Sequence, residues 1–227
     1  FAHTGLDVHL AEHDAKMEGF TSIPTSSSYN KLLQEYGNAS FGFEKVLSKR
    51  IAYLQAIGIN NFKDFFEKVT ALRMTESETA AEYLGIKNRV EKILGISLEK
   101  DLLAWMGNEI VLAQSNPSKL HHNEDDMLMA IKANQIDFAT EKLFHIQAQI
   151  RKRTPAKYKK LTYKSHDIYY LDIKGFFGMF FGNAFSKITK PYYTIIGDYI
   201  VFSNEINTLV SAIEDYKNGE VLASSED

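Results

Sequence analysis

Cysteine is absent from this 227-residue sequence. Its absence excludes disulfide bonds, zinc sites built on thiolates and catalysis by a thiol. An excess of positive charge is also missing, because 26 basic residues face 29 acidic ones and the net charge is −3. A general nucleic-acid-binding protein needs a basic footprint, so this balance argues against nucleic acid as a partner.

Long apolar runs are missing as well. No run reaches the ~20 residues that a helix needs to cross a bilayer, so we expect no transmembrane segment in these residues. The chain starts at Phe1 rather than at a methionine, and no charged segment followed by an apolar one marks a signal peptide. We therefore expect a processed chain or a piece of a longer one, soluble or peripheral to a membrane.

Familiar catalytic motifs are not found. The sequence contains no P-loop, no G-x-S-x-G, no H-E-x-x-H and no G-x-G-x-x-G. A catalytic triad can be assembled from distant residues, so a hydrolase stays open as the alternative function. A cleft that gathers His166, Asp167 and a serine would favour it. No catalytic residue, cofactor or metal ligand is predicted.

The stretch HHNEDD, residues 121–126, is the one dense group of ligand-type side chains. Helical zinc motifs place two histidines four residues apart, whereas His121 and His122 are adjacent. No EF-hand spacing follows either. We interpret the stretch as a solvated polar loop between two strands.

The remaining composition is that of a globular protein, with 44% hydrophobic and 24% charged residues. At the start, Leu6, Val8 and Leu10 alternate with polar residues, which predicts a half-buried strand. Residues 15–22 are expected to return as a second strand, and 31–36 to form a short helix. We divide the chain into 1–39, strands and a short helix that end a preceding unit, and 40–227, an α+β domain.

The second segment carries a repeated pattern of an apolar run, an asparagine and an amphipathic helix. The asparagines are Asn60, Asn134 and Asn204. Asparagine is a favoured N-cap because its side-chain oxygen accepts an orphan backbone N–H. Each is therefore predicted to cap the helix that follows, as repeated strand–Asn–helix units.

Other elements complete this scheme. A helix is expected at 76–94, a short helix capped by Ser97 and ending near Gly107, and strands at 109–115 and 126–133. Two hairpins are expected to turn at 165–167 and at 197–198, the latter through a type II′ turn. Hairpins that alternate with helices predict an α+β fold with a mostly antiparallel sheet, built from repeated hairpin–helix units with helices packed on one face.

A basic run, RKRTPAKYKK, precedes a phenylalanine-rich stretch, GFFGMFFGNAF. Charge runs usually face water, and apolar runs of this length are usually core. Basic and aromatic side chains together also hold peripheral proteins to anionic membrane surfaces. The candidate interaction surface comprises Arg151, Lys152, Arg153, Lys157, Lys159, Lys160, Phe176, Phe177, Phe180 and Phe181.

Three segments resemble a bacterial family catalogued only as a domain of unknown function. They are SFGFEKVLSKRIAYLQAIGINNFKDFF, LLAWMGNEIVLA and YYTIIGDYIVFSNEINTLVSAIEDYKNG. The second resembles the family's tryptophan–glycine–acidic–aliphatic element through Trp105, Gly107 and Glu109. The resemblance implies an exported protein of the cell envelope or periplasm, associated with the membrane through a part of the chain outside these residues. It implies no activity and no site residue.

We accordingly expect a non-enzymatic bacterial envelope protein that acts as a binding or scaffolding module. Its expected partner is a protein, a lipid or a membrane surface, either another envelope protein or an anionic membrane. A flat or grooved apolar face beside residues 151–164 would favour this function over the hydrolase.

Overall fold

The computed structural model describes residues 3–12, 15–22, 28–37, 39–75, 77–116, 127–153, 160–171, 177–178, 185–189 and 191–224.

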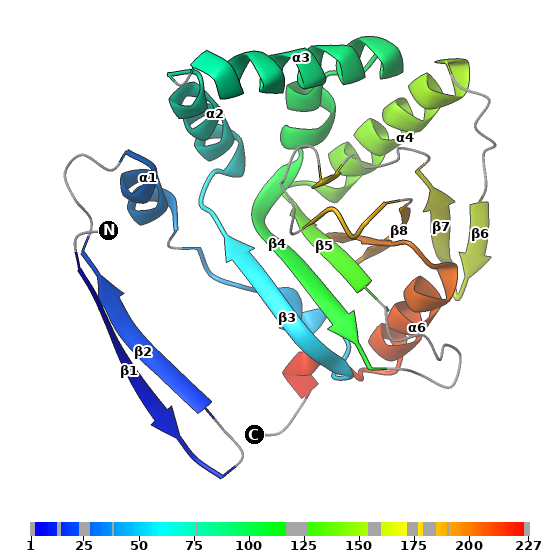
Figure 1. The fold of residues 1–227 in the computed structure, drawn as a ribbon. Coiled ribbons are helices and arrows are strands. Elements are labelled where there is room, and N and C mark those ends of the chain that lie inside the picture. The colour runs from blue at the N-terminus through cyan, green and yellow to red at the C-terminus, as the bar shows by residue number, and fades with distance from the viewer. Residues whose placement is uncertain are drawn as a thin grey trace.

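A seven-stranded sheet forms the centre of the protein (Figure 1). All neighbouring strands run antiparallel. The strand order is β3 (Ile51–Gly58), β4 (Met106–Ser115), β5 (Met127–Ala133), β9 (Tyr199–Ser203), β8 (Tyr192–Ile196), β7 (His166–Tyr170) and β6 (Lys160–Tyr163). The predicted α+β class with a mostly antiparallel sheet is therefore confirmed.

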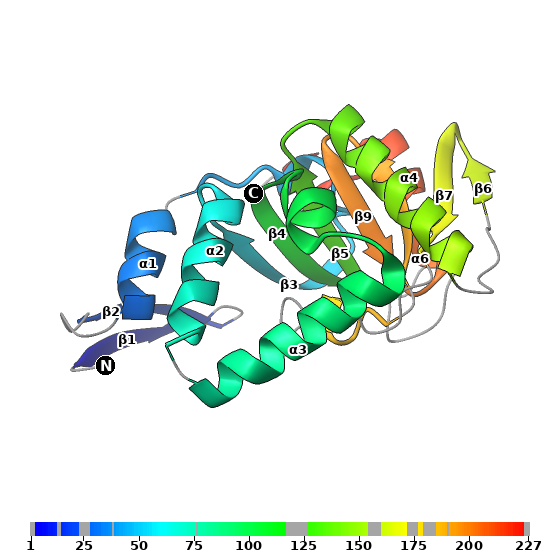
Figure 2. The ribbon, with the colours of Figure 1, turned by 90° about the horizontal axis from the view of Figure 1, so that it is seen from above.

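One face of the sheet carries the larger core. Ile110 and Leu112 of β4 point into it, together with apolar residues of α2 (Phe62–Arg73), η2 (Leu98–Leu103) and α4 (Ile136–Arg153). A second layer is formed by α3 (Ser77–Leu94), which packs on α2 and α4 (Figure 2).

The opposite face carries a second core. Val111 and Ala113, the alternate residues of β4, meet residues of α6 (Ile206–Lys217) and the segment around η1 (Phe43–Lys45) there. The short helix η4 (Leu222–Ser224) packs against η1. Helices thus lie on both faces, and the expectation of a single helical face is wrong. The physical reason is visible in β4, where unbroken burial from Ile110 to Ala113 requires cover on both sides.

The first residues stand outside this sheet. β1 (Thr4–Leu10) and β2 (Ala15–Thr21) form a separate two-stranded hairpin, and α1 (Ser28–Tyr36) packs beside α2. Tyr36 at the end of α1 is buried in the larger core, and its carbonyl accepts from the Asn60 N–H at 2.8 Å. The division at residue 39 stays a prediction.

Both predicted hairpin turns are present. Tyr199 pairs with Ile196 across Gly197 and Asp198, and Gly197 has φ +57°, as a type II′ turn requires at its first central position. The other turn lies at Lys164–Ser165, one residue before the predicted place. Both residues have positive φ, 44° and 65°, which is the type I′ pattern.

The asparagines predicted to cap helices mostly have other roles. Asn61, not Asn60, caps α2 by accepting the Asp64 N–H, and Glu205, not Asn204, stands at the cap of α6. Asn134 and Asn204 instead donate to the backbone carbonyls of Met106 and Lys187. The cap prediction is wrong for α2 and α6, and the side chains of Asn134 and Asn204 fasten neighbouring segments to strand ends. Ser97, in contrast, caps η2 as predicted, while Gly107 lies inside β4.

Asn61 offers a direct test of the observed cap. Its φ is +52°, a conformation that asparagine and glycine tolerate better than alanine. We expect Asn61→Ala to lower the free energy of unfolding by about 1–2 kcal/mol and Asn61→Gly by only a few tenths. Urea denaturation measures both, and equal losses would contradict the assigned cap and backbone strain.

Candidate functional site

The predicted basic surface is only partly described. Arg151, Lys152 and Arg153 are exposed in the last turn of α4. Lys160, at the start of β6, is exposed but engaged, since its ammonium lies 2.8 Å from the Asp167 carboxylate. Lys157 and Lys159 lie outside the described residues.

The phenylalanine part of that surface requires a correction. Phe177 is fully buried, and its ring packs edge-on against Phe202 of β9 at 4.8 Å between centroids. It belongs to the core, because an apolar side chain beside an open stretch of sheet gains more from burial than from exposure. Phe176, Phe180 and Phe181 lie outside the described residues.

Neither the metal site at residues 121–126 nor the hydrolase site at His166 and Asp167 is supported by the described residues. Residues 121–126 lie outside the described part of the chain, and the described residues contain no group of three or more metal-ligating side chains. His166 contacts the Lys164 carbonyl and the Tyr216 ring. Asp167 accepts from Lys160, Thr162 and Tyr169, and the hydrogen bond from Lys160 contributes most to lowering its pKa. The contacts of His166 and Asp167 thus stabilise a hairpin, and among the described residues no serine hydroxyl bonds to either side chain.

Glu109 is the most enclosed charged group described. Its side chain is fully buried on β4 and accepts hydrogen bonds from the Gly42 N–H, the Phe43 N–H and the Tyr199 hydroxyl, at 2.9, 2.9 and 2.7 Å. Burial, followed by the hydrogen bond to Glu109, raises the pKa of Tyr199, which keeps its hydroxyl protonated as a donor. With its oxygens occupied, this carboxylate clamps residues 42–43 to the sheet rather than meeting a substrate.

Trp105 and Gly107, which form the tryptophan–glycine–acidic motif together with Glu109, also have structural roles. Trp105 is fully buried, and its indole N–H donates to the Asp101 carbonyl at 3.0 Å. A Cβ on Gly107 would lie 2.9 Å from the Lys132 carbonyl oxygen, so only glycine lets β4 approach β5 there. The tryptophan–glycine–acidic element is therefore a packing and clamping device.

The β1–β2 hairpin presents an apolar face to solvent. Cross-strand register places Leu6, Val8 and Leu10 opposite Gly19, Met17 and Ala15. The exposed fractions are 60% for Leu6, 49% for Val8, 79% for Leu10 and 63% for Met17. We call Leu6, Val8, Leu10, Ala15 and Met17 the hairpin face. The predicted alternation is correct, but the predicted half-burial is wrong, because nothing in the described residues covers this face.

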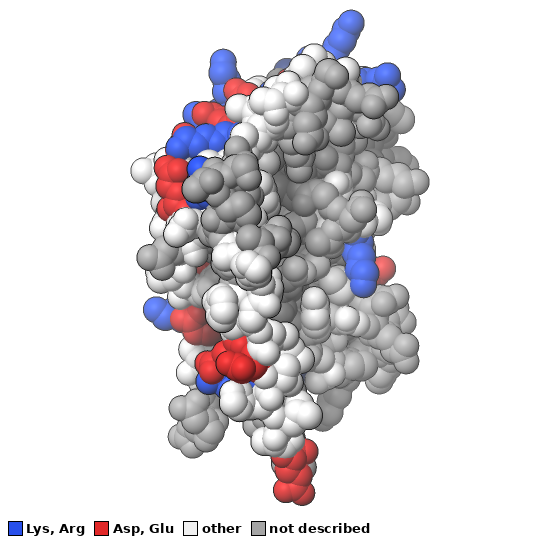
Figure 3. Space-filling view, turned by 60° about the vertical axis from the view of Figure 1, so that its left-hand side comes forward, with Lys and Arg blue, Asp and Glu red and all other residues white. Residues whose placement is uncertain are grey.

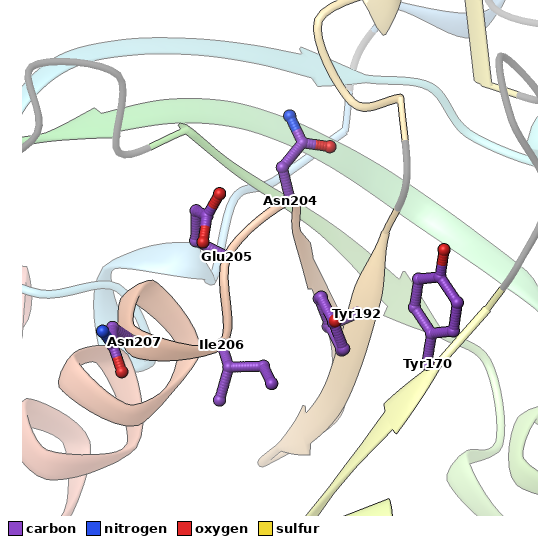
Figure 4. A pocket seen from close by; sticks show the side chains of 6 residues that line it. All are labelled: Tyr170, Tyr192, Asn204, Glu205, Ile206 and Asn207. Atoms are coloured by element: carbon purple, nitrogen blue, oxygen red, sulfur yellow. The ribbon is translucent and has the colours of Figure 1, made fainter. Parts of the chain in front are cut away.

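A second surface feature is a hollow of about 420 Å³ where β7, β8 and β9 meet the start of α6 (Figure 4). We call it the tyrosine pocket. Its described lining is Tyr170, Tyr192, Asn204, Glu205, Ile206 and Asn207. Tyr170 and Tyr192 face each other across the β7–β8 pair, with ring centroids 4.8 Å apart.

Sequence reasoning missed the tyrosine pocket, although a signal exists. Each of the two neighbouring strands holds a Tyr-Tyr pair, residues 169–170 and 192–193. Alternation sends one tyrosine of each pair to each face of the sheet. Tyr169 and Tyr193 enter the larger core and stack at 5.2 Å, which leaves Tyr170 and Tyr192 together on the other face.

Residues 95–227 match the model of a family described as "Protein of unknown function (DUF3352)". No curated protein and no solved structure matches the chain.

The matched segment covers β4, β5, α4, the β6–β9 strands and α6, and contains Glu109, Tyr199 and the tyrosine pocket. It is more than half of the 227 residues. The chain belongs to the family of proteins of unknown function DUF3352.

Proposed function

We propose that this chain is a non-enzymatic bacterial envelope protein, a binding or scaffolding module that docks a protein partner through the hairpin face. The single observation that carries the proposal is the exposure of that face. Two-stranded hairpins are marginally stable in water unless something packs on them. An apolar face of this kind, separate from the body of the protein, is typical of an interaction site.

The edges of the hairpin favour a protein over a lipid as the partner. Within the described residues, β1 and β2 pair only with each other, so each has an outer edge without a neighbouring strand. Another protein can add a strand there and satisfy the backbone N–H and C=O groups. Hydrocarbon offers no hydrogen bonds to such groups, so burying these edges in a bilayer is costly.

The charge of the hairpin also favours a protein over a lipid as the partner. The described residues of the hairpin and its ends include Asp7, Glu12 and Glu18 against the single cation Lys16. Anionic lipid headgroups attract basic segments, not acidic ones. Figure 3, which brings this side of the protein forward, shows acidic and basic side chains interspersed among the described residues. The basic residues Arg151, Lys152 and Arg153 lie on a different element, α4.

The envelope location rests on the family resemblance and is tested separately, by fractionating cells that carry the full-length protein with an epitope tag. No described helix is long and apolar enough to cross a membrane. Recovery of the tagged protein in the cytoplasmic fraction alone would contradict the location.

The docking proposal is tested with a photo-crosslinking amino acid at Leu10 in living cells. We expect a discrete adduct whose protein partner is identified by mass spectrometry and then purified. The double variant Val8→Glu/Met17→Lys places opposite charges across the centre of the hairpin face and should weaken binding at least about tenfold. Its own stability should change by no more than about 0.5 kcal/mol, because both sites are exposed.

His9→Glu is the matched control, since His9 lies on the other face opposite Lys16. It should leave the dissociation constant within about twofold, as expected for a residue outside the contact. Absence of any adduct at Leu10 would contradict the proposal. Binding of the purified chain to phosphatidylglycerol vesicles, lost in the double variant, would assign the hairpin face to a membrane instead.

A further inference from the structure

We propose that the tyrosine pocket binds a neutral sugar ring. This inference is independent of the hairpin face, since the pocket is formed by other strands and by the first turn of α6.

The aromatic wall is formed by Tyr170 and Tyr192. Both are half-buried, whereas their sequence neighbours Tyr169 and Tyr193 are buried at 7% and 1% exposure. In Figure 4 the two rings rise from neighbouring strands, with Ile206 beyond Tyr192. The face of an aromatic ring carries partial negative charge, and the C–H groups on one side of a sugar ring carry partial positive charge. Tyrosine walls are therefore suited to the C–H face of a sugar.

The polar groups come from the start of α6. Glu205 and Asn207 are exposed, and the Glu205 side chain makes no hydrogen bond to the end of its helix. A carboxylate accepts hydrogen bonds, and an amide both donates and accepts. Hydroxyls of a sugar also donate and accept, so this pair can satisfy two of them on one edge of the ring.

Asn204 makes the rim rigid. Its side-chain oxygen accepts the Thr189 N–H at 2.8 Å, and its amide donates to the Lys187 carbonyl at 2.7 Å. These two bonds fasten the segment before β8 to the end of β9. A pocket whose rim is fixed before the ligand arrives loses less entropy on binding.

The charge of the lining excludes other ligand classes. Glu205 is the one charged side chain among the described lining residues, so phosphate or sulfate groups would be repelled. The positive end of the α6 dipole lies at the same place and offsets part of the attraction of Glu205 for a cation. The polar rim disfavours a purely apolar ligand. A neutral polyol meets none of these penalties.

The size is also suitable. A hollow of about 420 Å³ lies in the range of pockets that hold small molecules. A second hollow of about 370 Å³ has Tyr53 as the one aromatic ring among its described lining residues, which also include Lys187. It provides a matched control site for the same ligand.

The experiment measures binding of chitotriose, cellotriose and maltotriose to the purified chain by saturation-transfer NMR and calorimetry. We expect at least one sugar to bind with a dissociation constant of roughly 0.1–5 mM, the weak end of specific affinities. Tyr170→Ala should weaken that binding at least about tenfold and Asn207→Ala about fivefold, since a tenfold change needs only the loss of one good contact. Tyr53→Ala, in the other hollow, should leave it unchanged.

Several outcomes would overturn the inference. One is the absence of binding by all three sugars at about 20 mM, well above the expected constants. Others are binding that survives both Tyr170→Ala and Asn207→Ala, or that Tyr53→Ala abolishes. Choline is the cation probe: choline binding that is tighter than sugar binding and lost in Glu205→Gln would assign a cation site. Val8→Glu/Met17→Lys should leave sugar binding intact, so this proposal and the docking proposal fail separately.

Discussion

Replacing Glu109 by alanine is expected to lower the free energy of unfolding by about 3–5 kcal/mol, because three hydrogen-bond donors lose their buried acceptor at about 1–2 kcal/mol each. The donors are the N–H groups of Gly42 and Phe43 and the hydroxyl of Tyr199. The carboxylate that joins them is fully buried, so water cannot replace it without opening the structure. Urea denaturation followed by circular dichroism measures the loss.

Two further variants distinguish the loss of the Glu109 hydrogen bonds from the general effect of removing a charge. Tyr199→Phe removes one of the three donors and should cost about 1–2 kcal/mol. Glu67→Ala removes a carboxylate that is half exposed and should cost no more than about 0.5 kcal/mol. The amides of Gly42 and Phe43 should also exchange hydrogen faster in Glu109→Ala. An unchanged denaturation midpoint for both Glu109→Ala and Tyr199→Phe would refute the clamp.

Phe177→Ala is the second change with a large expected effect, a loss of about 3–5 kcal/mol. Phe177 is fully buried in the larger core and packs on Phe202. The substitution removes the transfer free energy of the ring and leaves a cavity that the surrounding strands cannot fill by moving. Thermal and urea unfolding of the purified variant measure the loss.

Phe20→Ala is the matched control, because Phe20 is 71% exposed on the hairpin. It should change stability by no more than about 0.5 kcal/mol. Phe177→Leu should cost about 1–2 kcal/mol, since a smaller apolar side chain fills part of the space. A stable Phe177→Ala protein that no longer binds anionic vesicles would restore Phe177 to the predicted interaction surface.

Local sequence patterns were sufficient to predict several helices and strands. The alternation of apolar and polar residues predicted β1, and the Gly197–Asp198 turn predicted the β8–β9 hairpin. Ser97 predicted the start of η2. These features depend on residues near one another in the chain, and their physical causes act locally. The fold class followed, because hairpins that alternate with helices favour an antiparallel sheet.

The asparagine error and the burial of Phe177 have a common cause. Asn134 and Asn204 have the composition of caps, but partners 28 and 17 residues away compete for their side chains. Phe177 lies in a stretch whose pattern fits either a core segment or an exposed aromatic patch, and Phe202 of β9 packs on it. Distant partners decide both cases, and local pattern carries no information about them.

By itself, the sequence determined the strands, most helices, the α+β class and the resemblance to a family. Tertiary structure decided which charged group is buried, which apolar face stays open and which aromatic rings meet. Glu109 binds residues 66 and 67 positions earlier in the chain, and Tyr170 meets Tyr192 only through strand register. The hairpin face has the same alternation as a buried strand. Burial depends on whether another element reaches a residue, and that is settled only when the whole chain packs.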